Sequence, residues 1–370
     1  MNLRKVIGPA LSLLLIAGVL VAIRRSIHDK MDADKAARHT AGLITVKVLT
    51  SSEKEQFLTD PELVRVLDAE GIAITVQKAE SREIATHPDL KSFDVAYPAG
   101  AHAALKIAET TGSKRVYPSF FTPMAVASWK TLIPVLEKAG LVSNKGGAFF
   151  IIDMDRLVEA MEKGTRWKDL PGNTAYAVGK AVLITSTDVR KSNSGAMYLS
   201  LATYVANGNN VVDNDADANK VASSMVGLFS KQGFQDFSSV GPFEDYTAMG
   251  IGKDPLVMIY EQQFLEYIQS HATPNPDMVL LYPAPTILAQ HTIVALSDNG
   301  VRFAQVMISN PKVSSIAQRF GFRSQDSSEL FAAAERKGLA IPHTLVDVID
   351  PPSYDILEKL IGRVDAALNR

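Results

Sequence analysis

The sequence predicts a two-lobed α/β protein with mainly parallel sheets, preceded by one apolar N-terminal segment. The length of 370 residues is long for a single core and indicates about two lobes or domains. Hydrophobic residues make up 46% of the chain, which is enough for packed interiors and excludes a wholly disordered chain. Strand-like runs alternate with helical patterns at the spacing of βαβ units, which favours a parallel sheet with helices on both faces.

The first element is an apolar segment that follows two basic residues. Residues 6–23 carry no charge and would span roughly 27 Å as a helix, close to the hydrocarbon thickness of a bilayer. No small-x-small cleavage site follows, so we favour an uncleaved single-span transmembrane helix over a cleaved signal peptide, which stays the alternative. We assign residues 1–25 to this transmembrane anchor or signal segment and residues 26–42 to a polar tether.

Strands and helices alternate after the tether. Residues 44–49 alternate in polarity and are β-branched, which is typical of a strand. Hydroxyl residues followed by acids at 50–55 predict a helix start, and the helical pattern from Pro61 ends at Gly71. The remaining elements expected in this part are strands at 72–76 and 92–97 and an alanine-rich helix up to about Glu109.

A second α/β unit follows. The apolar run 148–152 leads into a helix at 154–163 that Gly164 ends. Its other expected elements are strands at 181–185, 256–260 and 278–282, and a helix at 194–205. Two proline-containing stretches, 123–127 and 274–285, are candidate crossings between the units. The predicted parts are therefore lobe one (43–125), lobe two (126–275), a return to lobe one (276–325) and a C-terminal helical extension (326–370).

Two hydroxyl-rich turns are candidate binding sites. In open parallel sheets, ligands bind beyond the carboxyl ends of the strands, where helix N-termini offer free backbone N–H groups and a partial positive charge. Ser51 and Ser52 follow the first predicted strand and the segment 185–195 follows a later one. For the two serines, a role as ordinary helix caps is as well supported as ligand binding.

The second turn is denser in polar groups. Arg190 adds a fixed charge with planar donors, Ser192 and Ser194 add hydroxyl groups, and Gly195 allows a close backbone approach. We favour a ligand role for this turn over a purely structural one.

Taken in order, these segments resemble the extracellular solute-binding proteins of ABC importers, nearest their oxyanion-binding branch. The resemblance covers roughly residues 44–323, and the order of its motifs carries more weight than any one of them. The matching motifs lie at 44–52, 187–195, 257–261, 281–283, 291–296 and 302–323. The resemblance implies the type II periplasmic-binding-protein fold, in which two crossover strands join two lobes and a cleft closes on a small solute.

The resemblance also implies which residues bind. Ser51 and Ser52 would bind from lobe one, and Tyr97 faces the same rim by topology alone. The residues implied from lobe two are Arg190, Ser192, Asn193, Ser194, Gly195 and Tyr260. The usual Asp-Pro of the second motif is Asp188 and Val189 here, and the extension from 326 lies beyond the core pattern.

The function implied is that of a membrane-tethered solute-binding protein, a single-pass protein of the cell membrane with its bulk in the periplasm or extracellular space. It would capture a small polar or anionic solute for uptake with an ABC permease. One alternative is a sensor or scaffold that docks on another envelope protein through residues 326–370. The other is an enzyme relying on Glu261 or Asp188, and we expect no enzyme.

The composition argues against several further classes of protein and of metal site. With 38 basic and 40 acidic residues the formal net charge is −2, which argues against a general nucleic-acid binder. The absence of cysteine excludes disulfides, zinc–thiolate sites, iron–sulfur clusters and a lipoprotein anchor. Residues 213–217 look like a calcium loop, but Ala218 and Ser224 stand where glycine and glutamate are needed, so we expect a helix-capping loop. No metal and no cofactor are expected.

Overall fold

The computed structural model describes residues 42–80, 82–146, 149–232 and 235–368. The predicted apolar segment 6–23 lies outside these residues. Among the described residues, no helix combines the length and apolar character needed to cross a membrane.

Ten strands of the described chain form one mixed sheet. The strands are β1 (Ile44–Thr50), β2 (Ile72–Lys78), β3 (Val95–Tyr97), β4 (Val116–Trp129), β5 (Val142–Lys145), β6 (Phe149–Asp153), β7 (Val257–Tyr260), β8 (Met278–Ala284), β9 (Thr286–Ala295) and β10 (Val348–Ile349). Their order is β2-β1-β3-β9-β4-β8-β6-β5, with β7 also on β4 and β10 on β9.

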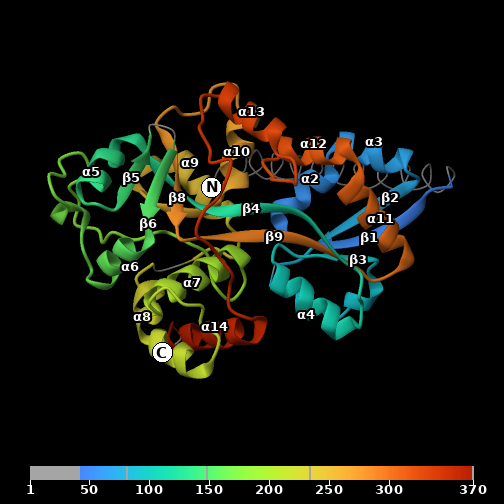
Figure 1. The fold of residues 1–370 in the computed structure, drawn as a ribbon, viewed down its shortest axis with the longest axis horizontal. Coiled ribbons are helices and arrows are strands. Elements are labelled where there is room, and N and C mark those ends of the chain that lie inside the picture. The colour runs from blue at the N-terminus through green and yellow to red at the C-terminus, as the bar shows by residue number, and fades with distance from the viewer. Residues whose placement is uncertain (1–41, 81, 147–148, 233–234, 369–370) are drawn as a thin grey trace, which may run out of the picture.

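The α-helices cover both faces of this sheet (Figure 1). They are α2 (Glu55–Thr59), α3 (Pro61–Ala69), α4 (Ala101–Thr111), α5 (Ile133–Lys138), α6 (Met154–Glu162), α7 (Asn193–Ala206), α8 (Asp215–Ser230), α9 (Val240–Met249), α10 (Glu261–Ser270), α11 (Asp298–Ser309), α12 (Pro311–Arg319), α13 (Ser328–Arg336) and α14 (Tyr354–Leu368). The predicted α/β fold is confirmed.

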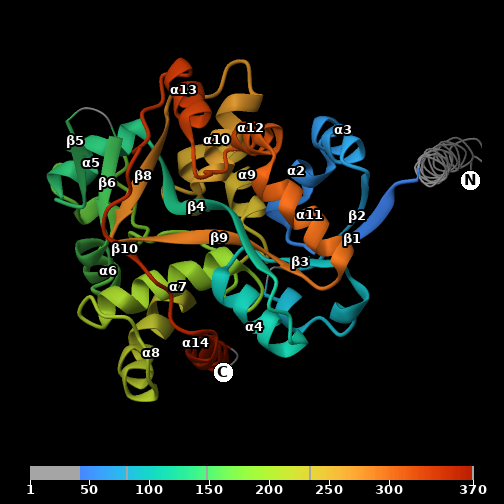
Figure 2. The same ribbon diagram turned by 45° about the vertical axis from the view of Figure 1, so that its right-hand side comes forward.

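Strand β4 belongs to two lobes. From Val116 to Pro123 it pairs with β9, and from Met124 onward it pairs with β7 and β8. Strands β1–β3 therefore form lobe one with β9 and the first half of β4, whereas β5–β8 form lobe two with its second half. In Figures 1 and 2, β4 and β9 run side by side from one lobe to the other.

The direction of pairing follows from this route of the chain. The pairs β1–β2, β1–β3, β6–β8 and β9–β10 are parallel, as strand–helix–strand units require. The antiparallel pairs involve β4 or β9, apart from the β5–β6 hairpin. The chain crosses to lobe two along β4 and returns along β9, so these two strands must run in opposite directions.

The expected strand at 181–185 does not form. Instead, Thr185 pairs with Val257 at one end, and Ala181 pairs with Arg166 at the other. Residues 181–185 lie at the edge of the lobe two sheet beyond β7, and Ala181 pairs with Arg166 rather than with β7. A continuous ladder therefore cannot extend along this segment.

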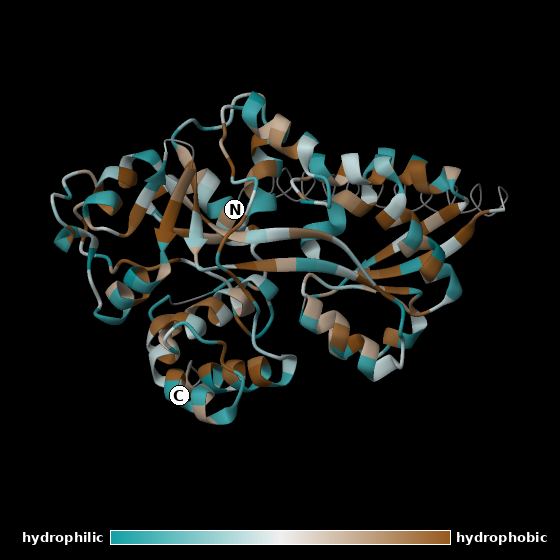
Figure 3. Ribbon diagram, viewed as in Figure 1, coloured by the Kyte–Doolittle hydropathy of each residue, from teal (hydrophilic) through white to brown (hydrophobic). Residues whose placement is uncertain are grey.

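Each lobe has its own apolar core. In lobe one, one cluster around Phe57 and Phe303 and a second around Leu49 and Ile107 cover opposite faces of the sheet. Lobe two and the C-terminal helices share a larger cluster. Figure 3 shows β6 and β8 of lobe two as largely hydrophobic. Because the cores are separate, the lobes can change their relative position without either core being opened.

The C-terminal extension forms two helices on different parts of the molecule. Helix α13 packs against α10 and α12. The chain then runs past β9, where β10 adds two residues to the sheet, and ends in α14 against α8. Figure 1 shows this last stretch passing in front of β9.

Candidate ligand-binding cleft

Helix starts from both lobes meet between the lobes. Lobe one contributes the start of α4 after β3, and lobe two contributes the starts of α7 and α10. The Oδ1 atom of Asn193 lies only 3.1 Å from where a Cβ of Gly100 would stand, so a larger residue at position 100 would crowd the Asn193 side chain. Asn193 also donates from Nδ2 to the Tyr260 hydroxyl at 3.0 Å. One side chain thus joins the starts of all three helices.

The wall of lobe one holds a buried ion pair directly after Ser51. Lys54 donates from Nζ to Glu53 Oε1 at 2.7 Å and to Ser51 Oγ at 2.8 Å, and lies 3.1 Å from His291 Nδ1. Only 1% of the Lys54 side chain and 5% of the Glu53 side chain are exposed. The Lys54 ammonium also stands 5.0 Å from the centre of the Tyr97 ring.

The ion pair between Glu53 and Lys54 affects the pKa values of ionisable groups around the cleft. Burial raises the pKa of Glu53, but the charges of Lys54 and His291 and the hydrogen bonds from Lys54 and Ser51 together outweigh burial and lower this pKa to about 2. Burial lowers the pKa of Lys54, and Glu53 acts against this shift. Burial also raises the pKa of Tyr260, and the carboxylate of Glu53 raises it further. Glu53 is therefore a carboxylate at neutral pH, close enough to act on a side chain of the opposite lobe.

The lobes touch each other at the rim of the cleft. The hydroxyls of Ser52 in lobe one and Ser238 in lobe two are 3.2 Å apart. At a second place, Arg82 of lobe one donates from Nε to the carbonyl of Arg190 at 3.1 Å, and Lys191 pairs with Glu83. The described arrangement is thus a closed one.

Ser192, Ser194 and Gly195 shape the turn before α7. The Ser194 hydroxyl is 2.9 Å from Thr187 Oγ1 and 2.8 Å from the Ser192 hydroxyl. A Cβ at Gly195 would stand 2.5 Å from the carbonyl oxygen of Thr187. These residues hold the α7 start in place, and Asn193 is the residue of the turn that reaches both Gly100 and Tyr260.

Arg190 was expected to bind the ligand, and in the structure it binds two carboxylates of the protein itself. Its guanidinium binds the Asp188 carboxylate through Nε at 2.8 Å and donates from Nη1 to Asp365 of α14 at 2.8 Å. The structure thus brings Asn193 to Tyr260, Ser51 and Tyr97 to Lys54, and Ser52 to Ser238 of the opposite lobe. Ser192, Ser194 and Gly195 lie in the supporting turn, and Arg190 pairs with α14.

Sequence reasoning missed four residues of this region, namely Glu53, Lys54, Gly100 and Ser238. Glu53 and Lys54 directly follow the serines that were singled out, and Glu53 counted only as a helix-start acid. Gly100 stands just before α4, at the same kind of strand end as Ser51. Ser238 has no signal in the sequence, because its position depends on how lobe two folds.

A cavity of about 150 Å³ remains open beside Gly100 and Asn193. Both lobes, β9 and the C-terminal segment contribute to it. Its lining residues are Arg82, residues 100–103, Asn193, Met197, Leu288, Gln290, residues 348–351, Tyr354 and Leu357. The cavity is therefore a part of the interlobe space that changes when the lobes move.

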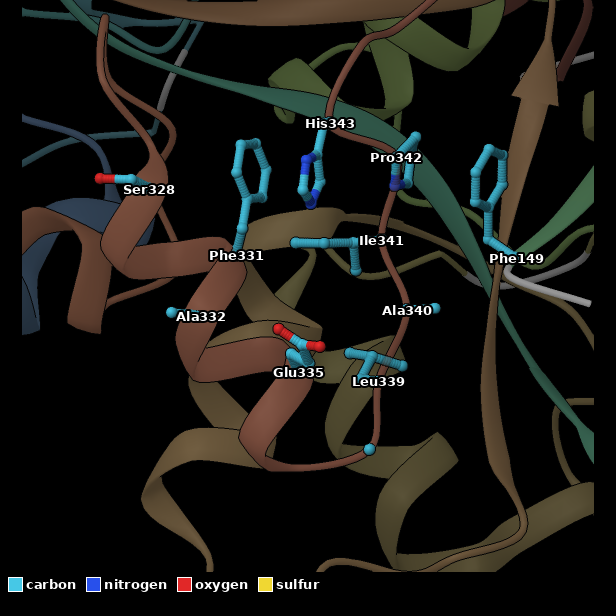
Figure 4. A pocket seen from close by; sticks show the side chains of 11 residues that line it. Phe149, Ser328, Phe331, Ala332, Glu335, Leu339, Ala340, Ile341, Pro342 and His343 are labelled. Atoms are coloured by element: carbon cyan, nitrogen blue, oxygen red, sulfur yellow. The ribbon is translucent and has the colours of Figure 1, made fainter.

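A larger cavity of about 780 Å³ lies elsewhere, between α13, residues 338–343 and Phe149 (Figure 4). Its lining is mostly apolar, and the rings of Phe331 and His343 stack 4.1 Å apart along one side. No lining residue comes from lobe one, so closure of the lobes leaves this cavity unchanged. The interlobe region is therefore the better candidate for a binding site.

The two carboxylates considered for catalysis are held in salt bridges. Glu261 is fully buried and accepts from Arg323 at 2.6 and 2.7 Å and from the Tyr282 hydroxyl at 2.6 Å. Asp188 pairs with Arg190. Among the residues that the structure describes, no three or more histidine, aspartate or glutamate side chains gather as a metal site would require.

No family model matches the sequence, and no curated protein matches it. Solved structures do match. The sulfate-binding protein SubI of Mycobacterium tuberculosis H37Rv is 12% identical, with a TM-score of 0.50, covering 87% of this chain and 98% of its own.

Two further solved structures match the chain. The periplasmic binding protein AfuA of Actinobacillus pleuropneumoniae, with fructose-6-phosphate bound, is 12% identical with a TM-score of 0.56, covering 88% of this chain and 98% of its own. Iron-bound HitA of Pseudomonas aeruginosa is 11% identical with a TM-score of 0.52, covering 88% and 97%. The chain has the type II periplasmic-binding-protein fold. At these identities the likeness concerns the fold, and these neighbours are binding proteins rather than enzymes.

Proposed function

We propose that the chain is an extracytoplasmic solute-binding protein that captures a small polar or anionic ligand between its lobes and passes it to an ABC permease. The main support is the meeting of the α4, α7 and α10 starts at Gly100, Asn193 and Tyr260, beside the Ser51–Ser52 turn. Helix starts with free N–H groups bind anions and polar oxygens. The apolar segment 6–23 supports a tether to the outer side of the cell membrane.

The mechanism needs only lobe closure. A ligand that contacts Asn193 and Tyr260 from one side and Ser52 from the other stabilises the closed arrangement over the open one. A ligand with hydroxyl donors can also use the ionised Glu53, whose charge Lys54 offsets. A ligand that combines acceptor oxygens with hydroxyl groups fits this cleft best.

A second candidate is a ligand-sensing or scaffold protein of the envelope with the same fold and no transport role. The open apolar cavity at α13 supports it, because an exposed apolar surface on a soluble lobe can serve for docking. Capture of an envelope protein that is lost after Phe331→Asp, with no ligand found, would favour this candidate.

Thermal unfolding with a ligand panel tests the binding function. The panel contains sulfate, phosphate, molybdate, sugar phosphates, sugars and amino acids. A ligand at 100 times its Kd stabilises the protein by about 2.7 kcal/mol, a rise of a few degrees in Tm. We expect at least one such rise, and a panel without any would contradict the proposal.

A matched pair of variants locates the site. Asn193→Ala removes the side chain that joins the three helix starts, and we expect it to abolish most of the ligand-induced rise in Tm. Asn219→Ala makes the same change at an exposed position of α8 and should keep the full rise. Equal responses of the two variants would move the site elsewhere.

A further inference from the structure

The C-terminal helix α14 is anchored on lobe two. Its buried side chains belong to the apolar cluster of that lobe, and the helix packs against α8. Polar contacts strengthen this docking, because Asp215 of α8 pairs with Lys359 at 2.9 Å and with Arg363 at 3.5 Å. Asp365 adds the contact with Arg190 at 2.8 Å. Helix α14 will therefore move together with lobe two.

The first turns of α14 also contact lobe one. Glu358 pairs with Arg82, whose side chain is only 10% exposed. Asp355 lies 3.5 Å from Lys106 of α4, and the Lys106 ammonium stands 5.8 Å from the centre of the Tyr354 ring. Figure 1 shows α14 lying below β9, between α8 and α4. One helix thus bridges the two lobes next to the contact between Arg82 and Arg190.

Arg82 is the residue where these contacts meet. Its Nη2 atom binds Glu358 of α14, and its Nε atom donates to the carbonyl of Arg190 in lobe two. Both partners move with lobe two, whereas Arg82 lies in lobe one. Rotation about β4 and β9 that opens the lobes would therefore break both contacts at once.

We propose that α14 is a latch that is fixed to lobe two and grips lobe one through Arg82 only in the closed arrangement. The latch sets the balance between open and closed forms before any ligand arrives. Because ion pairs form most of the grip, added salt should weaken it. A cleft that is held partly closed binds its ligand more tightly, since less free energy is needed for closure.

Distance measurement in the full chain tests the latch without a ligand. The chain has no cysteine, so two introduced cysteines can carry spin labels without background. Lys312→Cys on α12 of lobe one and Glu244→Cys on α9 of lobe two are exposed positions on opposite lobes, away from α14. Pulsed dipolar spectroscopy of this doubly labelled protein reports the distribution of open and closed forms.

Glu358→Gln removes the grip on Arg82, and Lys359→Gln removes a neighbouring ion pair that lies wholly on lobe two. We expect Glu358→Gln to raise the long-distance population about fivefold, as loss of a partly buried charged contact implies. Lys359→Gln should leave the distribution unchanged. Salt should lengthen the distances in the parent protein and have little further effect in Glu358→Gln.

Two results would overturn the latch. One is the same distance distribution in Glu358→Gln as in the parent protein, with both folded by circular dichroism. The other is an equal change in Glu358→Gln and Lys359→Gln, which would mean that α14 only stabilises lobe two. Neither result depends on a ligand, so failure of the proposed binding function would leave this test intact.

Discussion

Ser52 of lobe one and Ser238 of lobe two place their hydroxyl oxygens 3.2 Å apart across the mouth of the cleft. This contact joins the turn after β1 to the segment before α9 and exists only while the lobes are closed. It therefore provides a direct chemical measure of closure.

We predict that the double variant Ser52→Cys/Ser238→Cys forms a disulfide on mild oxidation, because the two side chains already meet and a disulfide needs Cβ atoms about 4 Å apart. Thiol titration in denaturant should find no free thiol in the oxidised double variant. Each single variant should retain its thiol, since the chain has no other cysteine. Two free thiols in the oxidised double variant would show that the lobes rarely meet at this point.

Gly195 is predicted to be essential for the turn before α7. A Cβ there would stand 2.5 Å from the carbonyl oxygen of Thr187, so Gly195→Ala must displace backbone and should cost about 1–3 kcal/mol. Gly227→Ala is the control, because it lies within α8 with open space around it and should stabilise by roughly 0.5–1 kcal/mol. Urea unfolding measures both, and the prediction fails if the two variants shift stability in the same direction.

The buried pair of Glu261 and Arg323 is predicted to dominate stability near the hinge. Arg323→Met leaves the carboxylate buried without its partner, which should cost about 3–5 kcal/mol. Arg115→Met breaks a pair with Asp298 in which the side chains are 48% and 92% exposed, and it should change stability by less than about 0.5 kcal/mol. Urea unfolding of both variants is the measurement. A small effect of Arg323→Met would mean that Glu261 gains water or another partner.

Glu53 should make stability depend on pH in the acid range. Its pKa falls from an ordinary 4.5 to about 2 on folding, so between these values the unfolded chain binds more protons than the folded one. Stability from Glu53 is thus complete above about pH 4.5 and is lost as pH falls toward 2. The slope is at most about 1.4 kcal/mol per pH unit.

Urea unfolding at pH 3, 4, 5 and 6 checks this prediction. Glu53→Gln should show a shallower loss of stability below pH 4.5 than the parent protein, whereas Glu137→Gln, at an exposed position of α5, should follow the parent. Parallel curves for all three proteins would rule out the ionised, buried Glu53.

The sequence predicted local features well and contacts between distant segments poorly. The end of α3 illustrates the first, since this helix stops at Ala69, just before Gly71, as expected. The hydroxyl turn at Ser51 likewise follows β1 as expected. Such signals depend on neighbours within a few residues, so periodicity and capping patterns reveal them.

Arg190 illustrates the contacts between distant segments. Its partner Asp365 is 175 residues away and belongs to a helix whose docking the sequence does not show. The importance of Gly100 depends on the starts of α4 and α7 lying close together in the folded chain, which the sequence does not show. The missing strand at 181–185 has the same origin, because strand patterning does not say whether a partner edge extends along the whole run.

The shared strand β4 has a further consequence. Because one continuous strand pairs in both lobes, a cut at Pro123 would leave each lobe with a shortened sheet and unpaired backbone groups. Neither half is an independent module that gene rearrangement could exchange or expression could isolate. A change of ligand specificity that keeps the fold would therefore be made in loops and helix ends that leave this strand intact.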